Sequence, residues 1–330
     1  MTETGNGRVG TGRRRRGARG ERLMVERAEF TSYYGRPILK EPTWSSVDIA
    51  GYFFLGGLAG AGSVLAAGAQ LTGRPATARA LKTSSALAIA GSAAALVHDL
   101  GRPGRFANML RVIKPTSPMS VGSWLLAGYG PAAAGACASA LTGRLPRLGT
   151  LATVGAATLG PAVATYTAVL AADTATPAWH DAHRHLPFVF AASATCAASG
   201  MALVASPVHE AGPARRAAVA ACAADLAATE MMTKQLGLVG ETYEQGKAGR
   251  LMHTARILTT AGALGAALLG GRSRTAAVLG GAALLAGSAL TRFGVFEAGV
   301  ASARDPKYTV VPQRSRMASR SEETDPAASA

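Results

Sequence analysis

The chain has 330 residues, of which 48% are hydrophobic and only 16% are charged, and its formal net charge is +15. Soluble domains carry about 25% charged residues, whereas the few charges of this chain gather in clusters between uncharged apolar stretches. This pattern excludes an ordinary soluble domain and indicates a polytopic membrane protein whose basic clusters meet anionic lipid or a docking partner, with no nucleic acid as ligand.

The two ends of the chain are polar. Residues 1–30 are rich in arginine, and we expect them to form a disordered basic tail. No long apolar run follows closely enough for a secretory signal, so we expect no cleavage. Residues 31–47 contain tyrosine and tryptophan, which suit the lipid headgroup zone. The last stretch, 313–330, is again polar, and we expect a second disordered tail.

The apolar runs between the tails predict eight transmembrane helices. A span needs about 20 residues to cross about 30 Å of hydrocarbon, and every backbone polar group in lipid needs an internal partner, which favours helices. We therefore predict an all-α, polytopic membrane domain over residues 31–312, with eight spans in two four-helix bundles. The predicted spans are about 49–71, 80–97, 119–141, 148–172, 186–207, 214–234, 254–271 and 275–293.

The connectors between the spans fall on two faces of unequal content. Short connectors share one face, which we call the short-loop face. The termini share the other face with the long connectors 98–118, 173–185 and 235–253, and we call it the long-loop face. Long ordered loops carry function more often than short ones, so we expect the long-loop face to be the working face. Both faces have similar numbers of basic residues near the membrane, and only the arginine-rich tail favours cytoplasmic termini.

Several kinds of bound redox or metal centre are not predicted in this chain. All histidines lie at span ends or in connectors, so no two are placed to ligate a haem from separate helices at mid-membrane depth. The cysteines lie far apart without a CxxC pair, which argues against an iron–sulfur cluster, a zinc site and a disulfide. His180, His183 and His185 could mimic a metal site, but their spacing fits no zinc pattern, and we expect no metal there.

Polar residues on the long-loop face fit a site for a lipid-soluble hydrogen carrier such as a quinone. Such a site needs an apolar slot, a hydrogen-bond donor near the carbonyl and a route for protons. Six residues at this face meet these needs: Asp48, Tyr52, His98, Asp99, Arg102 and Tyr166. The first two lie one helical turn apart on the first span, the next three follow the second span, and the last lies within the fourth.

These residues also have plain structural explanations. Asp99 could form an ion pair with a nearby arginine that clamps the loop, and the two tyrosines could be interfacial anchors. Asp225 and Glu230, within the sixth predicted span, could relay protons or could face water from an interfacial helix. The second hypothesis for the whole chain is therefore a structural anchor or a proton-translocating membrane protein without a quinone site.

A set of short motifs on and beside the predicted spans adds a more specific signal. The motifs are YYGRP at 33–37, YFFLGGLAG at 52–60, DLGRP at 99–103 with Arg105-Phe106, KPTSPMS at 114–120 with Gly122-Ser123-Trp124, and Tyr166-Thr167 followed by Pro177, Trp179 and Leu186-Pro187. Together they resemble the NrfD/PsrC family, the membrane subunits of polysulfide-reductase-like complexes, over about residues 33–312.

That resemblance implies an eight-helix subunit without haem that exchanges electrons with a quinone, usually menaquinone. It also implies an iron–sulfur protein of ferredoxin character that docks on the subunit and connects it to a molybdopterin catalytic subunit. Tyr166 matches the tyrosine of the family's fourth-helix YTG motif, whose glycine is here Ala168, and Asp48 and Tyr52 match a polar pair of the first helix. We therefore expect a multi-pass subunit of the cell membrane with no redox centre of its own.

Overall fold

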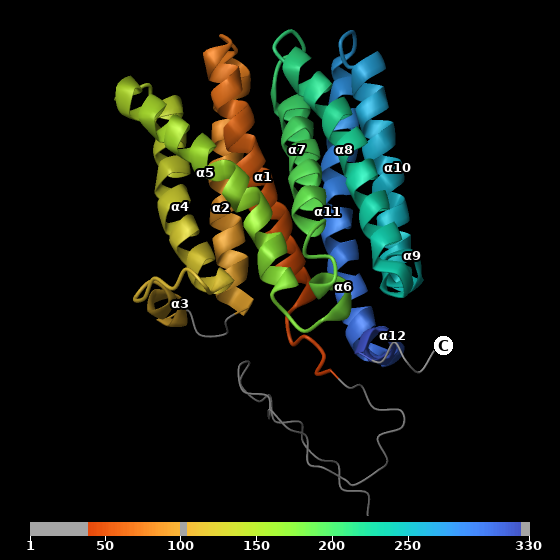
Figure 1. Cartoon of the computed structure of the whole chain (residues 1–330). Coiled ribbons are helices and arrows are strands. Elements are labelled where there is room, and N and C mark those ends of the chain that lie inside the picture. Colours follow the sequence, from red (N-terminus) through yellow and green to blue (C-terminus); the bar gives the residue numbers. More distant parts are fainter. Residues whose placement is uncertain (1–38, 100–103, 325–330) are drawn as a thin grey trace, which may run out of the picture.

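The structure is a computed structural model that describes residues 39–99 and 104–324 (Figure 1). This part of the chain is helical and contains no strand. The long helices follow the order of the predicted apolar runs. They are α1 (Ser46–Leu71), α2 (Pro75–Asp99), α4 (Pro118–Thr142), α5 (Pro146–Ala172), α7 (Leu186–Ala205), α8 (Gly212–Leu236), α10 (Gly246–Leu268) and α11 (Arg274–Arg304).

Shorter elements lie at the lower end of the molecule in Figure 1, which is the long-loop face. They are α3 (Gly104–Met109), α6 (Pro177–His180), the 3-10 turn η1 (Gly237–Gly240), α9 (Glu241–Glu244) and α12 (Lys307–Thr324). Helix α12 includes residues 313–324 of the predicted C-terminal tail, and the rest of that tail, 325–330, lies outside the described residues. The predicted basic tail over 1–30 lies outside the described residues.

Five of the long helices are long and apolar enough to cross a membrane: α1, α2, α5, α7 and α11. The chain is therefore an all-helical protein of membrane type. The predicted spans on α4, α8 and α10 fall short of the same criteria. Glycine and serine lower the apolar content of α4, and charged side chains interrupt α8 and α10.

The long helices pack in two groups that follow the chain. In the first group α1 packs against α2 and α5, and α4 packs against α5 and α2. In the second group α11 packs against α10 and α7, and α8 packs against α7 and α10. Helix α1 joins the groups because it also contacts α7 and α11. Figure 1 shows the two groups side by side with their helices running between the same two faces.

Small residues let these helices approach one another closely. A Cβ atom built on Gly60 of α1 would lie only 2.3 Å from the carbonyl oxygen of Gly160 on α5. Any side chain at Gly60 would push the two backbones apart, which accounts for glycine at this position. Gly56 and Gly60 form a GxxxG pair, and the close contact with α5 is made by the second glycine.

Glu210, in the connector between α7 and α8, ties the two groups together at the short-loop face. Its carboxylate accepts a hydrogen bond from the backbone N–H of Thr77, in the first turn of α2, at 2.8 Å. Desolvation tends to raise the pKa of Glu210, but hydrogen bonds from Thr77 and Ala76, together with the nearby His209, outweigh it and hold the pKa below its usual value. These N–H groups belong to the first turn of a helix, where no intrahelical partner exists.

We predict that Glu210→Gln lowers the melting temperature of the detergent-solubilised protein by about 3 °C at neutral pH, because a neutral amide is a weaker acceptor for the first turn of α2. Since the folded pKa of Glu210 lies below the ordinary value of 4.5, the carboxylate stabilises the fold above that value, and its contribution disappears as the pH falls through the folded pKa. The difference between wild type and variant should therefore shrink in acid. A difference that stays constant with pH would contradict this role.

Candidate functional site

The neighbouring ends of α1 and α2 bring three of the predicted site residues together at the long-loop face. The two helices run antiparallel, so the start of α1 lies beside the end of α2. Nδ1 of His98 lies 3.0 Å from Oδ2 of Asp48. Asp99 accepts a hydrogen bond from the backbone N–H of Ser45, at 3.0 Å, and so fixes the residue that caps α1.

The Asp48–His98 pair lies at the boundary between protein and surroundings. The side chain of Asp48 is 19% exposed and that of His98 is 58% exposed. A carboxylate and an imidazole in contact at such a place can exchange protons with water and pass them inward. Asp99 holds the backbone beside the pair, while Arg102, the sixth predicted residue, lies outside the described residues together with its possible contact to Asp99.

Tyr52 and Tyr166 meet inside the first group of helices. Their rings pack edge to face, with centroids 6.3 Å apart and planes at 76°. Tyr52 is fully buried, and no described residue forms a hydrogen bond with its hydroxyl group. A ring in this position does not anchor the helix in the headgroup zone, which removes that explanation for Tyr52. Tyr166 is half-buried on α5, and its hydroxyl group has no hydrogen-bond partner among the described residues.

Gly122 on α4 makes room for the phenol of Tyr166. A Cβ atom built on this glycine would lie 2.1 Å from Cε2 and 2.7 Å from the hydroxyl oxygen of Tyr166. The hydroxyl-bearing edge of the tyrosine ring therefore lies against the glycine, and the ring is held between α4 and Tyr52 of α1. Sequence reasoning noticed Gly122 only as part of the GSW motif and did not foresee that it shapes the position of Tyr166.

An aromatic cluster lies at the same face, between the chain entry to α1 and the second group of helices. Trp44 stacks on Trp179, with ring centroids 5.6 Å apart and planes at 18°. The indole N–H of Trp179 donates to the carbonyl oxygen of Val295 at 2.8 Å, and the Tyr243 hydroxyl donates to the carbonyl oxygen of Ala178, also at 2.8 Å. These contacts hold the long connectors against α11, and Trp44 stacks on one of them from the segment that leads into α1.

The histidines of the 173–185 connector make local contacts. Nδ1 of His180 lies 3.1 Å from the carbonyl oxygen of Ala172, and Nδ1 of His183 lies 2.9 Å from the carbonyl oxygen of His180. The imidazole of His185 contacts the side chain of Gln235 on α8. Within the described residues, no group of three His, Cys, Asp or Glu side chains is placed to hold a metal ion.

An apolar crevice of about 700 Å³ runs along α1, α2 and α7. Leu55, one turn beyond Tyr52, and Gly91 line it at mid-depth, and Arg79 lines it near the start of α2. One end of the crevice therefore lies close to Tyr52, and the crevice extends from there toward the short-loop face. The slot expected beside Asp48 and Tyr166 is not this crevice, which lies deeper along the helices.

We predict that Gly122→Ala destabilises the detergent-solubilised protein by about 1–3 kcal/mol, because the new methyl group overlaps the ring of Tyr166. Gly130→Ala on the same helix is the control, since nothing lies within 4 Å of its Cβ position. That change should be neutral or stabilise by up to about 1 kcal/mol. The cost of Gly122→Ala should disappear in a Tyr166→Ala background, and a cost that persists there would show that another contact is responsible.

Comparison with known proteins identifies the family. The sequence model of the family described as polysulphide reductase, NrfD, matches residues 37–255. The matched residues contain α1 to α9 and the first part of α10, and thus every predicted site residue. None of the curated proteins compared with the chain matches it. Because the match covers more than half of the chain and agrees with the motifs and the helical membrane-type fold, the protein belongs to the polysulphide reductase NrfD family.

Proposed function

We propose that the chain is the quinone-reactive membrane subunit of a multi-subunit oxidoreductase, and that it exchanges electrons between a docked iron–sulfur subunit and a membrane quinone, with menaquinone as the expected form. Membership of the NrfD family supports the role of a membrane subunit in a redox complex. The observation that carries the quinone site is the placement of the Tyr166 phenol, held by Gly122 and Tyr52 in the same half of the molecule as the Asp48–His98 pair.

In this proposal all eight long helices cross the plasma membrane. α4, α8 and α10 have 25, 25 and 23 residues, which at about 1.5 Å per residue reach about 35 Å and exceed the hydrocarbon thickness of about 30 Å. Each of them packs along an apolar helix: α4 on α5, α8 on α7 and α10 on α11. The less apolar helices therefore cross the bilayer against protein as well as lipid, which lowers the cost of their polar residues.

The residues of the site have separate tasks in this proposal. Tyr166 donates a hydrogen bond to a quinone carbonyl, because its hydroxyl group has no other partner among the described residues. Tyr52 packs edge-on against that ring and limits its rotation. Reduction of a quinone consumes protons as well as electrons, and the half-exposed Asp48–His98 pair takes protons from water at the rim.

We infer the partners from membership of the NrfD family, and a chain without a predicted redox centre would need them for electron transfer. A ferredoxin-like iron–sulfur subunit would bring electrons to or from the quinone and connect it to a molybdopterin catalytic subunit. The long-loop face suits such docking because two of its connectors, 173–185 and 235–253, are tied to the protein: Trp179 and Tyr243 donate hydrogen bonds to backbone carbonyl groups of neighbouring segments. Lys307 of α12 also pairs with Glu241 of α9 at 3.1 Å. A rigid face can hold a partner's cluster at a fixed distance from the quinone.

We predict that Tyr166→Phe lowers quinone-dependent turnover of the purified complex about tenfold, because one hydrogen bond to the quinone is lost. Subunit composition should not change. Tyr129→Phe is the matched control: its hydroxyl group contacts Oγ of Ser63 at 2.6 Å and the carbonyl oxygen of Ala59 at 2.5 Å. That variant should lose thermal stability and keep its turnover. Unchanged quinone turnover in Tyr166→Phe would count against the site.

We also predict that Asp48→Asn and His98→Gln change the pH dependence of quinone turnover in the same way. The double variant should be no slower than the more impaired single variant, because the two groups act as one proton-transferring pair. His209→Gln, an exposed histidine on the short-loop face, is the control and should leave the pH profile unaltered. Losses that simply add in the double variant would argue for independent roles.

A further inference from the structure

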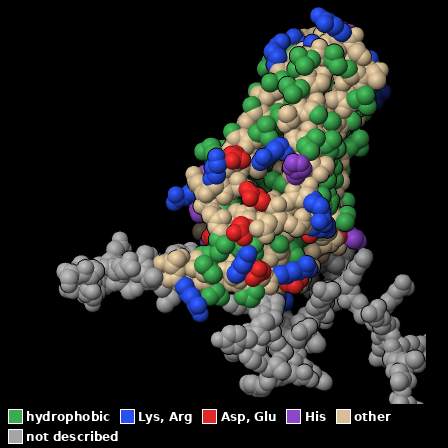
Figure 2. Space-filling view, turned by 90° about the vertical axis from the view of Figure 1, so that its right-hand side faces the viewer, with side chains coloured by type: hydrophobic (Ala, Val, Ile, Leu, Met, Phe, Trp, Pro, Cys, Tyr) green, Lys and Arg blue, Asp and Glu red, His purple; other side chains and the backbone are tan. Residues whose placement is uncertain are grey.

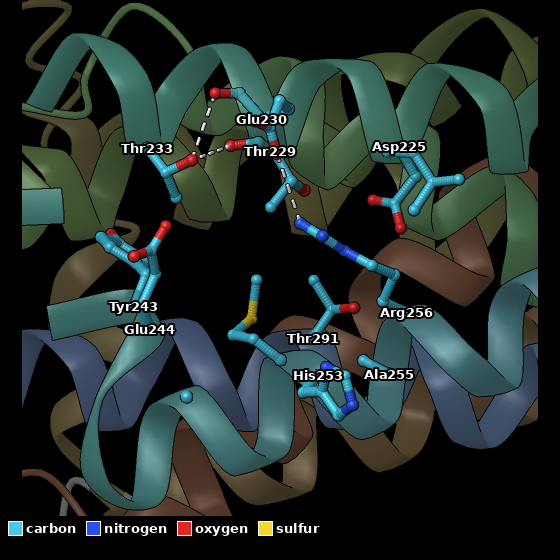
Figure 3. Close-up of a pocket in the computed structure, with 13 residues that line it drawn as sticks. Asp225, Thr229, Glu230, Thr233, Tyr243, Glu244, His253, Ala255, Arg256 and Thr291 are labelled. Atoms are coloured by element: carbon cyan, nitrogen blue, oxygen red, sulfur yellow. Dashed lines mark hydrogen bonds and ion pairs between the residues drawn. The ribbon is translucent and has the colours of Figure 1, made fainter. Parts of the chain in front are cut away.

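A polar cavity of about 220 Å³ lies in the second group of helices, between α8, α9, α10 and α11 (Figure 3). Its outer part is lined by the exposed residues Glu230, Glu244, His253 and Arg256, and Arg256 extends from α10 to within 3.5 Å of Glu230 on α8. Figure 2, which views the molecule from the side of α10, shows acidic, basic and histidine side chains gathered over the lower half. The cavity therefore opens among charged groups near the long-loop face.

Asp225 lines the inner part of this cavity. It lies about three turns before the end of α8, which places it about 16 Å from that end. Asp225 is only 5% exposed, and Oδ1 has no hydrogen-bond partner among the described residues. A carboxylate buried in this way is unfavourable unless water, a proton or an opposite charge compensates it. The sequence left open whether this helix merely faces water, and the burial of Asp225 argues against that.

Arg292 of α11 is the opposite charge at similar depth. It is fully buried, its Nη2 donates to the carbonyl oxygen of Phe190 at 2.7 Å, and its guanidinium carbon lies 3.7 Å from the centroid of the Phe190 ring. Nε and Nη1 have no hydrogen-bond partner in the described part of the chain. Buried water would satisfy these groups, which are two nitrogen donors of Arg292 and one oxygen acceptor of Asp225.

The charged and titratable groups that act on Asp225 come from every neighbouring helix. Arg292 and Arg256 act on Asp225 from α11 and α10, and Asp225 in turn acts on the thiols of Cys196 on α7 and Cys222 on α8. The cysteines carry no charge when they are protonated thiols, so the two arginines decide the charge that Asp225 meets. Arg256 is exposed and paired with Glu230. Arg292 is therefore the buried positive charge that acts on Asp225.

Toward the short-loop face, α7 and α10 pack closely against α11. A Cβ atom built on Gly262 of α10 would lie 2.7 Å from the carbonyl oxygen of Gly280 on α11, and one built on Gly200 of α7 would lie 2.5 Å from the carbonyl oxygen of Gly281. Helices at such spacing leave no room for a file of water between them. The polar path therefore runs from the long-loop face to mid-depth and stops at these contacts.

We propose that the cavity is a water-filled inlet that delivers protons from the long-loop face to Asp225, with Arg292, the neighbour of the lining residue Thr291, as the buried compensating charge. The Asp225 carboxylate takes a proton from hydronium in the inlet and releases a neutral water molecule, so one O–H bond breaks and one forms. The ring of Phe190 beneath Arg292 packs on Phe53, the neighbour of Tyr52, with centroids 5.7 Å apart. This buried charge thus lies beside the aromatic residues that lead to Tyr166.

The test uses dicyclohexylcarbodiimide, which reacts with protonated carboxyl groups in apolar surroundings, on the native complex in sealed vesicles of known orientation. The labelled peptides are identified by mass spectrometry, and the pH is varied on one side only. Asp225 should carry at least fivefold less label at about pH 9 than at about pH 5, and only when the pH changes at the long-loop face. Absent labelling, labelling that ignores pH, or labelling that follows the opposite face would overturn the proposal.

Variants distinguish delivery of protons through the cavity from direct exposure of Asp225 to solvent. Arg292→Gln removes the positive charge and should extend labelling of Asp225 to higher pH, whereas Arg292→Lys keeps the charge and should stay closer to wild type. Thr229→Leu fills the cavity and should make labelling insensitive to rapid pH changes, and Thr254→Leu, on the exposed side of α10, is its control. A filled variant that responds like wild type would contradict the inlet.

The inference rests on the membrane placement in the proposed function and does not rest on the quinone site. Labelling of Asp225 needs no quinone turnover, so a failed Tyr166 experiment leaves this test intact. In the same way, failure of the labelling test would leave the quinone site of Tyr166 standing.

Discussion

The contact between α1 and α5 at Gly60 and Gly160 is the constraint on which the rest of the structure depends. Helices in lipid gain little from hiding apolar surface, because the lipid is as apolar as the protein. They associate where small residues let backbones meet, and the would-be Cβ of Gly60 lies 2.3 Å from the Gly160 oxygen. That approach brings Tyr52 of α1 beside Tyr166 of α5, and α1 also reaches the second group of helices through α7 and α11.

The spacing of the helices also decides where polar groups can be buried. Near the short-loop face, glycine contacts between α7, α10 and α11 close the second group of helices. Deeper toward the long-loop face the helices separate enough to form a cavity of about 220 Å³ beside Asp225. The second group of helices is therefore closely packed near the short-loop face and holds its polar cavity nearer the long-loop face.

Arg292 stands at the meeting point of the two groups. A Cβ atom built on Gly57 of α1 would lie 3.1 Å from its Nη2, so a larger residue at this position would crowd the guanidinium group. Arg292 also lies outside the residues matched by the family, which end at 255. Arg292 thus lies over the ring of Phe190, which in turn packs on Phe53 of α1 in the first group.

Hydropathy and motifs alone determined the helical membrane class, the order of the long helices and the family, because an apolar run and a motif are local properties of the chain. Only the tertiary structure decided that Asp48 pairs with His98, that Asp99 holds Ser45, and that Gly122 positions Tyr166. The sequence places Arg292 near the end of an apolar run and does not predict a role for it. Its burial against Phe190 is visible only in the fold. Such contacts join residues far apart in sequence, and they depend on how each helix is rotated about its axis, which hydropathy does not record.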